Sequence, residues 1–75
     1  MNSERIINLA ERAIGMITAE RLRGMEPQTI VINTDDYATM CIENGVPPKT
    51  LWSFPLEHSG TLPPGSVLMT SAGPG

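Results

Sequence analysis

Cysteine and histidine are almost absent from this chain of 75 residues, which contains only Cys41 and His58. One cysteine cannot form a disulfide within the chain, and it fits a reducing cytoplasm. One cysteine and one histidine are also too few for a four-ligand zinc site of the usual kind. Disulfides and structural metals are the common supports of small domains, so a partner chain becomes the expected source of additional stability.

Positive charge and long apolar runs are scarce as well. The chain has 5 Lys and Arg against 8 Asp and Glu, a formal net charge of −3. Because nucleic-acid binding needs a basic surface, we do not expect nucleic acid as a partner. No apolar run approaches the ~20 residues of a membrane span, so we expect no membrane contact either. The charges of Glu4 and Arg5, without a small-residue cleavage pattern, do not fit a signal peptide.

The first predicted element is a helix from about Ser3 to Gly24. Gly24 suits a left-handed helix end, and Pro27 prevents the helix from resuming. At about 100° per residue, the apolar residues cover one broad half of the helical wheel. They are Ile6, Ile7, Leu9, Ala10, Ala13, Ile14, Met16 and Ile17.

A short β-branched run at residues 29–32 predicts a buried strand. A helix of residues 34–44 is expected next, with Gly45 as its terminator. Asn33 can accept from the amide of Asp36, whose side chain can reach back as in a capping box. Asp35 and Asp36 could instead bind a cation, but capping explains both more simply.

The last third of the chain holds the only Trp, the only Phe and six of the seven prolines. Trp52, Phe54 and Leu56 alternate with other residues, so they are expected to face one way from a strand. A turn at residues 58–60 leads back to a second strand at 66–70. We therefore expect a hairpin of two short strands, and Pro55 places the first of them at an edge or beside a bulge.

The order helix, strand, helix, strand, strand predicts an α+β fold. The amphipathic N-terminal helix would cover one face of the small sheet. Neither an internal repeat nor a linker interrupts this order, so a single small α+β domain is expected over residues 1–75. A domain of this size buries only about 60% of its unfolded surface, so its stability is marginal without a partner.

Three motifs in this order resemble one family. An Asn-x-x-Asp-aromatic helix start lies at Asn33, Asp36 and Tyr37. A Leu-Trp-x-x-Pro strand follows, at Leu51, Trp52, Pro55 and Leu56. A Leu-Pro-x-Gly turn into a final apolar strand closes the unit, at Leu62, Pro63, Gly65, Val67 and Leu68. Over residues 3–70 the chain resembles the axial domain of the tailed-bacteriophage major capsid protein, whose fold is shared with encapsulin shells.

This resemblance implies a non-enzymatic role and a surface suited to packing around a symmetry axis. It implies a phage or prophage protein that is capsid-related, located in the virion or in the cytoplasm of a bacterial host. The N-terminal arm, extended loop and long spine helix of a full capsid protein do not fit in 75 residues. Shell formation therefore does not carry over, and the chain is either a natural small protein or an excised domain.

A non-enzymatic protein-protein interaction module, with a virion structural or assembly role, is the preferred functional hypothesis. The alternative is a small phage-encoded inhibitor or sponge that neutralises a host enzyme, a defence complex or a signalling nucleotide. Catalysis is not expected, because Cys41 and His58 lack a third group to orient them as nucleophile and base. We expect no cofactor and no metal.

The expected contact residues are mostly on the first helix. Ile7, Ile14 and Met25 lie toward one edge of its apolar face, and Leu22 lies just beyond that edge. Some of these four should stay exposed and form a contact patch. We expect self-association or docking on a larger assembly through this helix, most simply as a closed symmetric oligomer. Trp52 is either a core residue or a binding hot spot, and the core position is the one we expect.

The core position of Trp52 predicts the result of one substitution. If Trp52 packs against the first helix through Ile6, Ala10 and Ile17, Trp52→Ala should cost about 3–5 kcal/mol of unfolding free energy. A loss of that size would unfold a domain this small. Urea denaturation of the variant would measure it. A folded variant that only lost a partner would place Trp52 on the surface.

Overall fold

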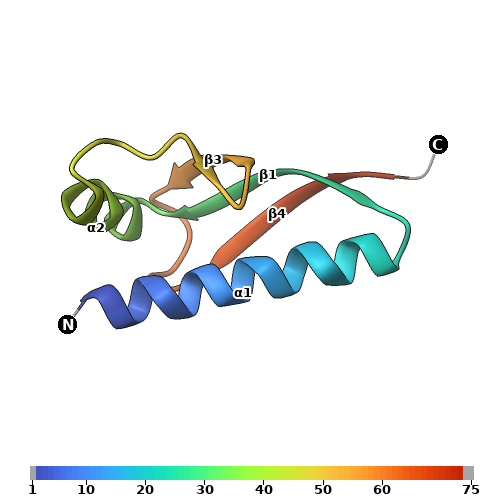
Figure 1. The fold of residues 1–75 in the computed structure, drawn as a ribbon, viewed down its shortest axis with the longest axis horizontal. Coiled ribbons are helices and arrows are strands. Elements are labelled where there is room, and N and C mark those ends of the chain that lie inside the picture. The colour runs from blue at the N-terminus through green and yellow to red at the C-terminus, as the bar shows by residue number, and fades with distance from the viewer. Residues whose placement is uncertain (1, 74–75) are drawn as a thin grey trace.

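Helix α1 spans Asn2–Leu22 and lies along one side of the sheet in the computed structural model, which describes residues 2–73 (Figure 1). The helix ends with Gly24 in the left-handed region, at φ 79°. The amide of Met25 donates to the carbonyl of Glu20 at 2.8 Å, which closes the last turn as in a Schellman motif. The predicted first helix and its glycine end are confirmed.

Strand β1 (Glu26–Asn33) and helix α2 (Thr34–Asn44) follow directly. The strand extends beyond the predicted residues 29–32, whereas α2 has the predicted bounds. Asn33 caps α2 because its Oδ1 accepts from the amides of Asp35 and Asp36 at 2.8 and 3.3 Å. Helix α2 lies at the end of the sheet next to the start of α1 (Figure 1).

Three strands complete the chain, β2 (Thr50–Leu51), β3 (Phe54–Ser59) and β4 (Val67–Ala72). The sheet has the order β2-β3-β1-β4. β1 pairs parallel with β3 and antiparallel with β4, and β2 pairs antiparallel with β3. The mixed sheet with its two helices confirms the α+β class.

The predicted hairpin between the last two strands is wrong. β1 lies between β3 and β4, so these strands do not pair with each other. The side chains of Ile30 and Ile32 on β1 are fully buried, and a central place in the sheet lets both neighbours cover them. The proline-rich segment 60–66 is therefore a connection across the end of β1 and not a hairpin turn.

Trp52 lies in a turn and not in a strand, contrary to the expected alternation. Trp52 and Ser53 have positive φ values of 54° and 71° and connect β2 to β3 as a two-residue hairpin turn. Positive φ at both positions matches the twist of the flanking strands. Phe54 and Leu56 keep the expected alternation, since Leu56 belongs to the core cluster and Phe54 packs against it.

The core lies between α1 and one face of the sheet. Its fully or nearly buried side chains come from three turns of α1 and from β1 and β3, namely Leu9, Ala13, Ile17, Ile30, Ile32 and Leu56. On the opposite face, Val31 lies in register with Glu57 and Leu68. The described residues thus form two layers, and among them no helix lies over this second face of the sheet.

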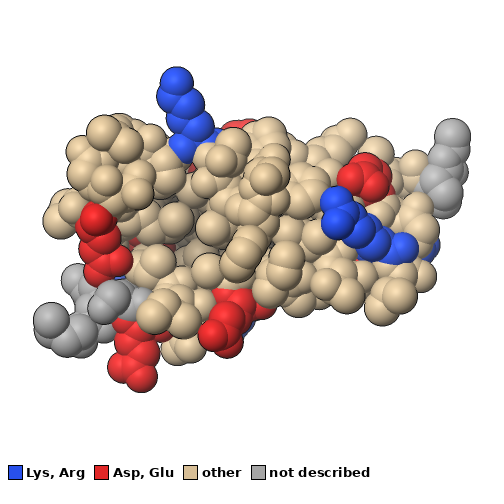
Figure 2. Space-filling view, viewed as in Figure 1, with Lys and Arg blue, Asp and Glu red and all other residues tan. Residues whose placement is uncertain are grey.

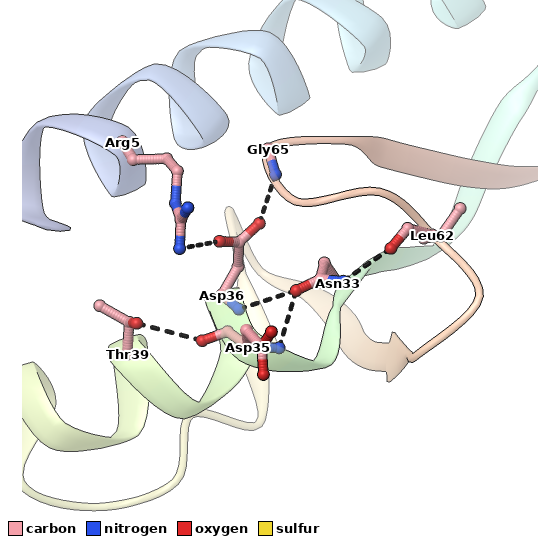
Figure 3. A network of polar contacts seen from close by, with 7 residues as sticks. All are labelled: Arg5, Asn33, Asp35, Asp36, Thr39, Leu62 and Gly65. Atoms are coloured by element: carbon pink, nitrogen blue, oxygen red, sulfur yellow. Dashed lines mark hydrogen bonds and ion pairs between the residues drawn. The ribbon is translucent and has the colours of Figure 1, made fainter.

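The side chain of Asp36 is fully buried and joins three parts of the chain (Figure 3). Its Oδ1 forms an ion pair with Arg5 of α1 at 2.9 Å, and its Oδ2 accepts from the amide of Gly65 at 2.6 Å. The ion pair is the only polar contact of Oδ1 among the described residues. The predicted capping-box role of the Asp36 side chain is therefore wrong, because the carboxylate points to Arg5 and Gly65 instead of back to Asn33.

The connection between β3 and β4 is fixed by two further hydrogen bonds. Asn33 donates from Nδ2 to the carbonyl of Leu62 at 2.6 Å, so the residue that caps α2 also binds this connection. Arg12 donates to the carbonyl of Gly65 at 3.2 Å. Gly65 has a φ of 82°, a conformation that favours glycine. The N–H of Gly65 is thus bound by Asp36 of α2, and its carbonyl is bound by Arg12 of α1.

Asp36→Asn should destabilise the fold more than Asp35→Asn. An amide at position 36 removes the charge and presents a donor to Arg5 or to the Gly65 amide, which are themselves donors. We expect a cost of about 2 kcal/mol, because the half-exposed Arg5 stays solvated. Asp35 is exposed, and its change should cost about 0.5 kcal/mol. Equal midpoints for both variants in urea would contradict the role of Asp36.

Candidate functional site

Two isoleucines on one flank of α1 remain exposed, Ile7 at 57% and Ile14 at 40%. They are seven residues apart, two helical turns, so they point the same way. Ala10 lies between them on this flank. The buried side of the helix carries Leu9 and Ala13 instead. Ile7 and Ile14 therefore form an apolar strip outside the core, where two of the expected contact residues are found.

Trp52 lies beside this strip. Its indole Nε1 donates to the carbonyl of Ala10 at 2.9 Å, which brings the β2–β3 turn against α1. The side chain is nevertheless 48% exposed. The predicted core position of Trp52 is wrong, and the cost of Trp52→Ala is accordingly smaller than for a buried tryptophan. We call Ile7, Ala10, Ile14 and Trp52 together the α1–Trp52 surface.

The structure does not bring Leu22 and Met25 into this surface. Leu22 is the last residue of α1 and is largely exposed, two turns beyond Ile14. Met25 is half-buried in the connection between α1 and β1. The four helix residues expected to form one contact patch therefore do not lie together. Ile7 and Ile14 adjoin the turn residue Trp52 instead of Leu22 and Met25.

Charged groups lie around the margins of this side of the molecule. Arg21 lies over the ring of Phe54, with 5.4 Å from its guanidinium carbon to the ring centroid, and 3.7 Å from Glu26. Figure 2 shows basic and acidic side chains together toward the right end of this view, a further basic side chain at the upper edge, acidic side chains at the left end and along the lower edge, and an uncharged centre. An uncharged centre with a charged rim is the usual arrangement of a protein-binding surface.

A hollow of about 540 Å³ lies next to this surface, at the end of α2. Ile6 of α1 is one of its lining residues and precedes Ile7 in sequence. The other lining residues come from α2 and the segment that follows it, and are Met40, Glu43, Asn44, Val46, Pro47, Pro48, Lys49 and Thr50. Sequence reasoning missed this hollow. It also missed the exposed Ile42 on α2, although Ile42 lies off the apolar face that the helical wheel assigns to Tyr37 and Met40.

Tyr37 lies between the chain's only histidine and its only cysteine. Its ring stacks on His58 with 4.6 Å between centroids, and its hydroxyl donates to the carbonyl of Pro48 at 3.1 Å. Thr34 Oγ1 lies 3.1 Å from Nδ1 of His58. Partial burial raises the pKa of the Tyr37 hydroxyl, and the neighbouring Cys41 side chain raises it further. These contacts tie His58 to Thr34 and Tyr37, and none of them orients it toward Cys41.

The two candidate cation ligands do not share a site. Asp36 points inward to Arg5 and Gly65, whereas Asp35 is exposed. No group of three His, Cys, Asp or Glu side chains suited to a metal ion occurs within residues 2–73. Over the same residues, neither helix has the length and apolar character needed to cross a membrane.

Comparisons of the chain with protein-family models, curated proteins and solved structures found no match. The resemblance to capsid axial domains, based on its three short motifs, stays a prediction.

Tyr37, the only tyrosine, should titrate above pH 10. The folded chain holds this proton to higher pH than the unfolded chain, since burial and Cys41 disfavour the tyrosinate. The resulting stability is fully present below about pH 10 and is lost as the pH rises through the folded pKa. Ultraviolet absorbance of the tyrosinate gives the midpoint, and Cys41→Ser should lower it. A midpoint equal to that in denaturant would contradict the burial of the hydroxyl.

Proposed function

We propose that the chain is a non-catalytic protein-interaction module that binds through the α1–Trp52 surface. The carrying observation is the half-exposed Trp52, held against α1 by its bond to the Ala10 carbonyl and placed beside Ile7 and Ile14. Tryptophan is enriched among residues that dominate binding energy. An indole fixed before binding loses little conformational freedom when a partner covers it.

The backbone of the β2–β3 turn supports this role. Positive φ is uncommon for residues other than glycine, and Trp52 and Ser53 both adopt it. Asn-Gly or Asp-Gly would form the same turn with less strain. Strained backbone gathers at sites whose function requires a particular side chain in a particular place. A large aromatic residue at this turn position is therefore better explained by contact with a partner than by the needs of the hairpin.

We infer that the module is of phage or prophage origin and capsid-related, with a virion structural or assembly role. Support comes from the motif residues of the resemblance. Asn33 and Asp36 of the helix-start motif bind Leu62 and Gly65 of the Leu-Pro-x-Gly motif. Motifs that contact one another specify a common packing, which is what a shared fold would require. The inferred location is the virion or the cytoplasm of a bacterial host.

The partner in this proposal is a second copy of the chain or a larger assembly built from similar units. Among the described residues, six apolar side chains of the core are buried, a small core that leaves a single chain marginally stable. A closed symmetric oligomer would cover Ile7, Ile14 and Trp52 on every copy.

Ile7→Lys with Ile14→Lys should reduce self-association through this surface while leaving the fold intact. Both residues lie outside the core, so the circular dichroism spectrum should not change. Two buried lysines per copy would weaken association at least about tenfold. Ile42→Lys with Leu22→Lys is the matched control, because it also replaces two exposed apolar residues by lysine, both outside the α1–Trp52 surface. Sedimentation velocity at several concentrations measures the result, and equal association of both variants would contradict the proposal.

A further inference from the structure

We propose that β4 pairs with β4 of a second copy, antiparallel and across a two-fold axis, so that two sheets become one. The sheet order β2-β3-β1-β4 makes β4 an edge strand with only β1 beside it. Trp52 connects β2 to β3 at the other side of the sheet. This contact is therefore separate from the α1–Trp52 surface and does not depend on it.

The two edges of the sheet differ in the features that normally prevent edge pairing. The β2 edge has only two residues, and Pro47, Pro48 and Lys49 precede it. Short strands, prolines and lysines are the usual protection of an edge. β4 has six residues, Val67–Ala72, with no proline and no charge. The register shift beside β4 places the additional residue, Gln28, on β1, so β4 itself is not bulged.

The outer edge of β4 has no hydrogen-bonded neighbour in the described part of the chain. No backbone hydrogen bond connects residues 67–72 to any described segment other than β1. The one side-chain bond of β4, from Thr70 Oγ1, is to Thr29 of β1 at 3.5 Å. An edge strand presents a row of N–H and C=O groups, which an added strand can bind without rearrangement of the sheet.

The composition of β4 points to a second copy as the occupant. Pairing across a two-fold axis places each side chain opposite a residue of the identical strand, so any charge would face the same charge or its neighbours. Val67, Leu68, Met69, Thr70, Ser71 and Ala72 carry none. The residues just outside, Ser66 and Gly73, are small and would not obstruct the approach. A charged foreign strand would find no complementary group here.

The side-chain alternation of β4 restricts the register. Val67 and Met69 pack against the core on the α1 side, whereas Leu68 is 50% exposed on the uncovered face. Directly opposite residues of an antiparallel pair lie on the same face, so even positions must meet even positions. The two-fold axis then lies midway between one residue of β4 and the same residue of the partner strand. Axes at Met69 and at Thr70 keep the most residues of Val67–Ala72 paired. The first opposes Leu68 to the partner's Thr70, and the second opposes Thr70 to the partner's Thr70.

Pairing in either register would also cover apolar surface. The axis is perpendicular to the sheet, so both uncovered faces lie on the same side of the dimer. Val31 and Leu68 are adjacent on that face in one copy. The joined sheet would extend this pair across the axis, next to the methyl groups of Thr70. Leu68 would thereby lose part of its contact with water.

Leu68→Lys with Thr70→Lys tests the pairing. Both residues are exposed on the uncovered face, so the monomer should keep its fold by circular dichroism. In either register lysines of the two copies would oppose each other, weakening the β4 contact by about tenfold or more. The variant with Ile7→Lys and Ile14→Lys lacks the α1–Trp52 contact, so any dimer it forms in sedimentation is due to β4. This dimer should disappear when Leu68→Lys and Thr70→Lys are added to the same chain. A monomer before the β4 changes, or a dimer after them, would overturn the proposal.

Cysteine crosslinking gives a second test that does not require a destabilising change. In a Cys41→Ser background, Thr70→Cys should form disulfide dimers alone if the axis is at Thr70. A mixture of Leu68→Cys and Thr70→Cys should crosslink if the axis is at Met69, because opposite Cβ atoms are about 4.5–5.5 Å apart. Glu57→Cys lies on the same face but on the interior strand β3, and should not crosslink. The β4 contact would be overturned if neither Thr70→Cys alone nor the mixture with Leu68→Cys formed disulfide dimers, or if Glu57→Cys crosslinked equally well. Neither result would affect the proposed α1–Trp52 surface.

Discussion

The buried carboxylate of Asp36 is the constraint on which the arrangement of this small fold depends. A carboxylate without solvent is costly unless it is paired and hydrogen-bonded, and Asp36 obtains its partners from distant parts of the chain. Arg5 comes from α1, and the Gly65 amide comes from the connection that carries the chain to β4. Satisfying this one group therefore sets the positions of both helices and of the crossing over β1.

The helices could be predicted from the sequence because their signals are local. The bounds of α2 follow from Asn33 and Gly45, which act within a few residues of themselves. Strand pairing is different, since apolar alternation gives the faces of a strand but not its neighbour. The segment after Ser59 reads as a turn, yet its path is decided by Asn33, nearly thirty residues earlier. No pattern in the segment itself contains that information.

The candidate site shows the same division. Ile7 and Ile14 could be expected at the surface because helical periodicity places them toward one edge of a broad apolar face. The position of Trp52 could not be predicted from the sequence. Trp52 and Ser53 have positive φ values, which remove Trp52 from the strand alternation, and neither residue is a glycine or asparagine that would indicate such a turn. The hollow beside Ile6 is formed by α1, α2 and the following loop together, so only the assembled fold shows it.

The central place of β1 has a consequence for synthesis of the chain. Both strands that pair with β1 come later, β3 at Phe54–Ser59 and β4 at Val67–Ala72. Until β3 and β4 emerge from the ribosome, β1 has no strand to pair with and Ile30 and Ile32 are not covered by a sheet. Helix α1 has already been synthesised by then. Folding must wait for these non-local contacts, which slows it relative to a helical domain of equal length. During that interval the helices α1 and α2 are the described elements available to shield β1, so the nascent chain depends on them to avoid aggregation.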